Sequence, residues 1–302
     1  MSNRAYHIPV LLTQSIDALL HNPDGIYVDA TFGGGGHSAE ILNRLSVNGR
    51  LFAFDQDYDA ARNVDERDSR LTFILSNFRH VQNHLAYYGV DKVDGILADF
   101  GVSSHEFDEQ SRGFSFRFDA ELDMRMNQAQ NLTAKIVLNE YSENKLANIF
   151  YKYGELNVGS KLAFKICRSR QDKSIDTINE LIDLIKDFTS DRTRNKFYAK
   201  VFQSLRMEVN GEVDALNDFL NTSVSLLKEG GKLVCITYHS LEDRPVKNLM
   251  KTGNVGGKSN KDFFGVQTIP FIGVSRKIVI PDAAEIAANP RARSAKLRVA
   301  TK

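Results

Sequence analysis

The 302-residue sequence has no tryptophan, only two cysteines and six prolines, and no apolar run long enough to cross a membrane. Cys167 and Cys235 lie far apart without a paired Cys-x-x-Cys spacing, which argues against a zinc site or a disulfide and favours small buried side chains. No secretion-signal pattern is evident near the N-terminus. These absences predict a protein of the reducing cytoplasm with no membrane partner and no metal.

An excess of charge of either sign is also lacking. The chain carries 39 Lys and Arg against 38 Asp and Glu, a net charge of +1, so any nucleic-acid binding must come from local basic patches. Its apolar and charged fractions are ordinary for a globular protein. The length allows two domains, or one domain with an insertion.

Residues 26–55 are the most informative stretch that is present. An apolar strand at 26–28 ends in Asp29, four consecutive glycines (33–36) lead into a helix, and a second apolar strand at 51–54 ends in Asp55. This order is typical of the front half of a nucleotide-binding βαβ unit. Glycine suits the turn because it tolerates positive φ and lets a ligand approach the backbone closely.

The acid before the glycines favours one ligand over another. Gly34, Gly36 and Ala39 satisfy the dinucleotide pattern G-x-G-x-x-A, so a nicotinamide cofactor is one alternative, and a turn needed only for packing is another. A pyrophosphate at the helix N-terminus would be repelled by Asp29, whereas the ammonium and sulfonium of S-adenosylmethionine would be attracted. We therefore expect S-adenosylmethionine, with Asp55 accepting hydrogen bonds from its ribose.

Helix and strand patterns alternate over the first hundred residues and again after residue 205, but between 107 and 205 only helical periodicity is found. This predicts an α/β fold: a doubly wound, mostly parallel sheet formed by residues 1–106 and 206–302, with an inserted all-helical domain at 107–205 for RNA recognition. The further strands are expected at 71–75, 93–98, 232–238, 277–280 and 296–300, and the further helices at 10–20, 79–88 and 245–250.

Two residues at strand ends are candidates for the chemistry. Asp99 follows the fourth strand, where its carboxylate could accept a hydrogen bond from an exocyclic base amine; its alternative role is to cap the following turn. His239 lies just past the fifth strand and could take the proton that such an amine loses, although a lone histidine is more often a structural hydrogen-bond partner.

Several segments could contact RNA, each with a plainer alternative. Phe114 and Phe116 could stack on unpaired bases, or belong to the core. Arg206 shares a helix face with Gln203 and Asn210, which could meet a ligand or solvent. Two groups of cations could contact phosphates or could simply be solvated charge: Arg291, Arg293, Lys296 and Arg298 near the C-terminus, and Arg192, Arg194, Lys196 and Lys200. Arg244, just past the fifth strand, is a further candidate for RNA contact.

Taken in order, the motifs resemble one family over nearly the full length: H-x-P-V-L-L from His7, the glycine segment, D-F-G-V-S-S, R-G-F-S-F, L-D-M-R-M, F-Q-S-L-R-M-x-V-N, H-S-L-E-D-R and N-P-R-A-R-S-A-K-L-R. The family is the bacterial ribosomal small-subunit RNA (cytosine-4-N-)-methyltransferases. The resemblance implies a class I, Rossmann-like methyltransferase fold with a helical insert, and S-adenosylmethionine as the donor. It also implies methylation of a decoding-centre cytidine in 16S ribosomal RNA, presented on the 30S subunit.

Carried over motif by motif, the resemblance also places the donor site. The family's donor-binding positions fall on Gly35, Gly36, His37, Asp55, Phe78, Asp99 and Glu106.

The chain departs from the family pattern at three places: His105-Glu106 replaces Pro-Gln, Leu156-Asn157 replaces an acid and an arginine, and Lys200-Val201 replaces Arg-Thr. The last two affect the RNA contacts of the insert more than methyl transfer.

Two alternatives of other classes stay open at this point: an NAD(P)-dependent oxidoreductase, and a non-catalytic ribosome-assembly factor that keeps a donor-binding fold. Oligomeric state is open as well, with a homodimer as one alternative.

Overall fold

The computed structural model describes residues 9–101, 109–258, 269–275 and 277–302. The chain forms two compact units, which we call the sheet unit (Met1–Gly101 and Val213–Lys302) and the helical unit (Val102–Glu212). The expected domain boundary at 205/206 falls inside one continuous helix, α9 (Arg194–Asn210). The helical unit therefore includes all of that helix.

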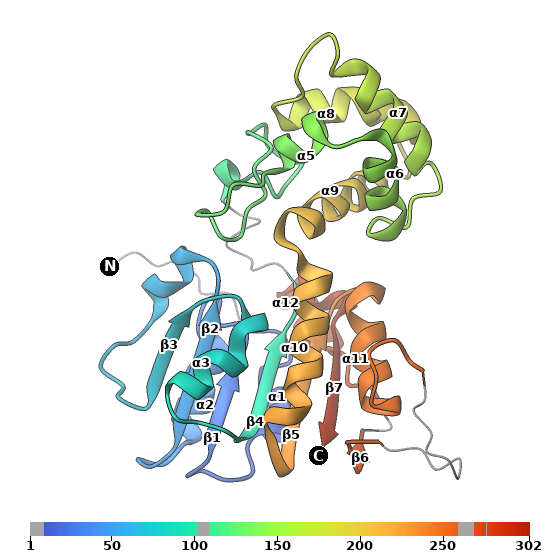
Figure 1. Cartoon of the computed structure of the whole chain (residues 1–302). Coiled ribbons are helices and arrows are strands. Elements are labelled where there is room, and N and C mark those ends of the chain that lie inside the picture. Colours follow the sequence, from blue (N-terminus) through green and yellow to red (C-terminus); the bar gives the residue numbers. More distant parts are fainter. Residues whose placement is uncertain (1–8, 102–108, 259–268, 276) are drawn as a thin grey trace. The chain divides into compact units, whose positions relative to one another are not determined.

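The sheet unit is built on a seven-stranded sheet with the order β3-β2-β1-β4-β5-β7-β6 (Figure 1). Strands β1 to β5 run parallel, and β7 runs antiparallel to both β5 and β6. The prediction of a doubly wound, mostly parallel α/β sheet is confirmed. The strands are β1 (Ile26–Asp29), β2 (Arg50–Asp55), β3 (Leu71–Leu75), β4 (Val93–Asp99), β5 (Leu227–Thr237), β6 (Gly273–Val274) and β7 (Lys296–Thr301).

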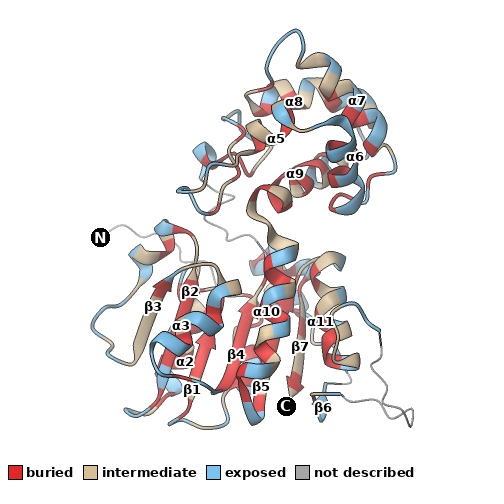
Figure 2. Ribbon diagram, in the orientation of Figure 1, coloured by how far each residue is buried: buried red, intermediate tan, exposed pale blue. Residues whose placement is uncertain are grey.

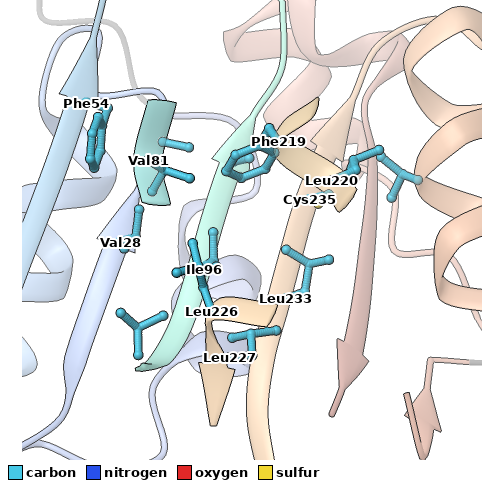
Figure 3. Packing of buried hydrophobic residues seen from close by; sticks show 14 of the residues in the cluster. Val28, Phe54, Val81, Ile96, Phe219, Leu220, Leu226, Leu227, Leu233 and Cys235 are labelled. Atoms are coloured by element: carbon cyan, nitrogen blue, oxygen red, sulfur yellow. The ribbon is translucent and has the colours of Figure 1, made fainter. Parts of the chain in front are cut away.

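Alternating side chains of the buried strands enter two separate cores, because successive residues of a strand point to opposite faces of the sheet. Val28 and Ile96 pack on one face beneath α3 (Val81–Tyr87), α10 (Glu212–Leu226) and α11 (Ser240–Thr252). Figure 3 shows the labelled members of this core, among them Val81 and Phe219. Tyr27 and Leu97 pack on the other face with α1 (Leu12–Leu19) and α2 (Gly36–Arg44). Both faces being covered explains why the central strands are almost fully buried (Figure 2).

Strand order reverses at β1, which lies between β2 and β4. In an open sheet of this type the chain leaves β1 and β4 toward opposite sides, and a crevice forms at their carboxyl ends. That edge carries Asp29, Asp55 and Asp99, each the last residue of its strand.

The helical unit contains α5 (Ala134–Glu140), α6 (Glu143–Lys152), α7 (Gly159–Ser169), α8 (Ile178–Ile185) and α9. Helix α8 begins with a capping box, in which Thr177 and Glu180 each accept a backbone N–H of the other. Phe114 is buried, and Phe116 packs edge-on against Tyr198 and Phe202, so both belong to the core. Base stacking by this pair is therefore not supported.

Three expected elements differ from those observed. Residues 277–280 form no strand; of these, Val279 makes a single bridge to Leu297. Strand β5 begins at Leu227 rather than at residue 232, and a register shift against β4 accommodates Gly230 at φ +78°. Helix α11 begins at Ser240, with Pro245 inside it, rather than at the proline.

Short helices complete the described chain: η1 (Tyr58–Asn63), η2 (Phe78–His80), η3 (Gln110–Arg112), η4 (Lys186–Phe188), α12 (Ala283–Ala288) and η5 (Pro290–Ser294). Among the helices that the structure describes, none is both long and apolar enough to cross a bilayer.

Candidate active site

The glycine turn between β1 and α2 needs glycine for different reasons at its four positions. Gly33 and Gly35 have φ of +51° and +77°, a region that other residues rarely adopt. A Cβ on Gly36 would lie 2.2 Å from Pro9 Cγ, so this residue is required for packing. Gly34 has neither constraint, because its φ is not positive and an added Cβ would meet no atom within 4 Å. Close approach of a ligand to the backbone would explain a glycine there.

Asp29 is a buried anchor of this turn. Its side chain is completely buried; Oδ1 accepts the Thr31 N–H at 3.0 Å and Oδ2 accepts the Ser38 hydroxyl at 2.6 Å. Burial raises the pKa of Asp29. The expectation that Asp29 faces a cationic ligand is wrong, because both oxygens point into the protein and tie β1 to the first turn of α2.

His37 belongs to the same buried support. Its Nε2 lies 3.2 Å from the Val10 carbonyl oxygen, and burial lowers the pKa of the ring despite the nearby Asp29. A ring buried in this way fixes the position of the turn. Any contribution of His37 to a ligand comes through its backbone or through this support.

Asp55, at the end of β2, holds the glycine turn through a hydrogen bond. Its Oδ2 accepts the Gly33 N–H at 2.7 Å and its Oδ1 accepts the Asp57 N–H at 2.8 Å, while the residue stays partly exposed. Burial of the carboxyl raises its pKa to about 6. Each carboxylate oxygen has two acceptor sites, so Asp55 can still accept hydrogen bonds from two ribose hydroxyls.

Phe78 follows β3 at the same edge of the sheet. Its half-buried ring packs edge-on against Phe100 and Phe219, with centroids 5.9 and 5.2 Å away. These contacts hold the ring in place and leave part of it accessible to a ligand.

Asp99, at the end of β4, is held from two sides. Its backbone N–H donates to Thr31 Oγ1 at 2.7 Å, and its Oδ1 accepts the Tyr238 hydroxyl at 2.8 Å. Burial, together with the charges of Asp29 and Glu242, raises the pKa of Asp99 to about 8. Tyr238 is a site residue that the sequence analysis missed, and its only signal was its position between the end of β5 and His239.

His239 lies next to Tyr238 but is directed elsewhere. Its Nε2 is 2.7 Å from Glu242 Oε1, and within the described parts of the chain the ring makes no hydrogen bond to Asp99. The Nδ1 atom is buried without a hydrogen-bond partner among those residues, and the Glu242 contact lacks hydrogen-bond geometry. The structure thus brings Asp99 and Tyr238 together and leaves His239 facing Glu242.

The four arginines expected at the RNA have different surroundings. Arg206 is almost fully buried and its guanidinium holds both oxygens of Glu212 at 2.8 Å, so its role is structural and the expected phosphate contact is wrong. Gln203 and Asn210, on the same face, bond to backbone groups of the helical unit. Arg244, Arg291 and Arg293 are exposed.

Two further predictions concern residues outside the described ones: the donor contact of Glu106, and His7 at the start of the H-x-P-V-L-L motif. Over the part of the chain that is described, no cluster of His, Cys, Asp and Glu could hold a metal ion. Cys167 and Cys235 are both unpaired thiols, and burial raises their pKa.

Comparison with known proteins gives the same answer as the motifs. Residues 4–302 match the model of the MraW methylase family. A protein named ribosomal RNA small subunit methyltransferase H from Bacteroides thetaiotaomicron is 57% identical, over 98% of this chain and 97% of that protein. One of the same name from Flavobacterium johnsoniae is 51% identical, over 98% of each.

Proposed function

This chain belongs to the MraW methylase family, and we propose that it transfers a methyl group from S-adenosylmethionine to small-subunit ribosomal RNA. The acceptor in this proposal is the exocyclic 4-amino group of a decoding-centre cytidine in 16S RNA. The proposal rests mainly on one cluster at the carboxyl edge of the sheet, where the strand order reverses: an open glycine turn beside Asp55 and Asp99. The nicotinamide-dependent alternative gains no support from the family match.

The residues of the turn fit the proposed donor. The unobstructed surface of Gly34 admits the ligand to the backbone, the free acceptor sites of Asp55 suit two ribose hydroxyls, and Phe78 offers an aromatic surface. With Gly35, Gly36, His37 and Asp99 these residues form the proposed donor site, together with Glu106 outside the described residues. When bound, the donor supplies an electrophilic methyl group on a sulfonium sulfur.

Asp99 is the residue to which we assign the chemistry at the amine. The lone pair of the cytosine N4 atom is delocalised into the ring, so a carboxylate that accepts one of its N–H groups favours the attacking form. The nitrogen then forms the N–C bond, the electron pair of the C–S bond stays on sulfur, and one N–H proton leaves. Asp99 in its ionised form can accept that proton. His239 is the second candidate, and its contact with Glu242 would have to change for it to act.

RNA contacts are assigned to the exposed basic residues of both units. Arg244, Arg291 and Arg293 belong to the sheet unit, whereas the first turn of α9 and the residues before it carry Arg192, Arg194 and Lys196. Such cations bind phosphates without reading sequence, and they position the RNA while the target base is turned out of its stack. The proposed substrate is the 30S subunit, and the proposed place of action is the cytoplasm.

Comparison of 16S RNA from a deletion strain and from the wild type by mass spectrometry tests the assignment. We expect one cytidine of the decoding centre to lose its N4-methyl group, and to regain it when the wild-type chain, but not Asp99→Asn, is supplied. An unchanged methylation pattern in the deletion strain would refute the substrate assignment. Purified chain that binds 30S subunits yet incorporates no methyl group would favour the assembly-factor alternative.

A further inference from the structure

Tyr238 joins the ends of two neighbouring strands. It directly follows β5, and Asp99 ends β4, which pairs with β5 so that Asp99 lies opposite Ile236. The Tyr238 hydroxyl donates to Asp99 Oδ1 at 2.8 Å. The hydrogen bond therefore links the ends of β4 and β5 at the carboxyl edge of the sheet, where the proposed reaction takes place.

Tyr238 is itself held in place at both ends. Its backbone N–H donates to Glu242 Oε2 at 2.8 Å, and Glu242 is buried in the first turn of α11. Its ring packs against the core that contains Val234 and Ile236, and close to Gly101, where an added Cβ would lie 3.2 Å from the ring. The phenol is therefore an immobilised hydrogen-bond donor and not a mobile surface group.

The two carboxylate oxygens of Asp99 therefore differ in their hydrogen bonding. Oδ1 is occupied by Tyr238, whereas no side chain or backbone group in the described ranges donates a hydrogen bond to Oδ2. We propose that Tyr238 is a positioning residue for methyl transfer: its hydroxyl fixes the Asp99 carboxylate so that Oδ2 accepts from the amine of the target base. This inference rests on the proposed function and extends it to a residue outside the donor site.

The charges around this pair give the hydrogen bond a measurable effect. The negative charges of Asp29 in β1 and Glu242 in α11 raise the pKa of Asp99. Glu242 and Glu285, which lies in α12, have the same effect on the pKa of Tyr238. Burial and these acidic neighbours together raise the pKa of Tyr238, so the phenol remains a donor at working pH. The Tyr238 hydrogen bond lowers the pKa of Asp99 and opposes the effect of burial. Without it, Asp99 would take up a proton at a higher pH and lose its acceptor function.

Tyr238→Phe removes only the hydroxyl. We expect methyl incorporation into 30S subunits to fall about tenfold at neutral pH, with the acidic limb of the kcat profile shifted upward by about one pH unit. Because Asp99 mediates the effect, adding Tyr238→Phe to Asp99→Asn should cause no further loss. Tyr27→Phe is the matched control: Tyr27 is buried, and its hydroxyl donates at 2.9 Å to the carbonyl of Asn22, which precedes β1 and is not part of the site. It should leave the pH profile unchanged.

Two outcomes would overturn the inference while leaving the proposed function intact. One is wild-type activity for Tyr238→Phe, and the other is an equal loss at every pH, which would indicate a merely structural role. A carbon-13 NMR titration of Asp99 in the ligand-free protein is independent of activity and should show a higher pKa in Tyr238→Phe than in the wild type. An equal pKa would also overturn it. A wild-type chain that leaves the cytidine amine unmethylated would refute the proposed function, and this inference with it.

Discussion

At the scale of single residues, the structure separates glycines that the fold requires from one that it does not. Gly33 and Gly35 adopt left-handed φ, and Gly36 has no room for a side chain because of Pro9. Gly34 is exposed and unconstrained, so the fold itself does not require glycine at this position. The four glycines look equivalent in the sequence, and only the backbone conformation and packing in the folded protein distinguish them.

Gly34→Ala tests this distinction. We expect a normally folded protein, because the new methyl group meets no atom of the chain, with affinity for S-adenosylmethionine weakened about tenfold, or about 1.4 kcal/mol. Isothermal titration calorimetry and thermal unfolding measure the two properties separately. The matched variant Gly36→Ala should instead lower the unfolding free energy by about 1–3 kcal/mol through overpacking against Pro9. Unchanged donor affinity in Gly34→Ala would show that the ligand does not approach this glycine.

At the scale of elements, features that depend on near neighbours followed from the sequence. The capping box of α8 is of this kind, because Thr177 and Glu180 lie three residues apart on one turn and need no distant partner. The strand expected at 277–280 was wrong although its apolar pattern is suitable. Gly273 and Val274 pair with the end of β7, and Val279 meets the same strand only at Leu297, so the pairing along β7 is interrupted. Pairing with a distant strand decides such an element, and the local pattern does not report it.

The junction of α9 and α10 offers a prediction at this scale. Arg206 and Glu212 form a bidentate ion pair with side chains only 10% and 15% exposed. Arg206→Ala should lower the unfolding free energy by about 3 kcal/mol, because it leaves a buried carboxylate without its partner. Chemical denaturation of the purified variant measures this loss. A stable Arg206→Ala protein with weakened RNA binding would restore the role that the sequence first suggested.

At the scale of the whole molecule, RNA binding must come from local patches because the net charge is only +1. Arg293, exposed in η5, should contribute one phosphate contact. We expect Arg293→Ala to weaken RNA binding and to reduce the slope of log K against log salt by about 1, with donor affinity unchanged. Salt-dependent binding assays measure the slope. Arg67→Ala serves as the control, since this exposed arginine is paired with Asp65; an equal change in both variants would contradict a specific contact at Arg293.

The amino-acid sequence was enough to predict the alternating α/β pattern, the glycine turn, the strand-end carboxylates and the family. These features are written in runs of neighbouring residues, where periodicity and turn chemistry act. Tertiary structure alone decided that Asp29 is a buried anchor, that Arg206 is bound to Glu212, and that Tyr238 holds Asp99. Tyr238 and Asp99 are 139 positions apart, and pairing of β4 with β5 brings them within 2.8 Å. A hydrogen bond depends on distance and burial, and for distant residues the folded sheet sets both.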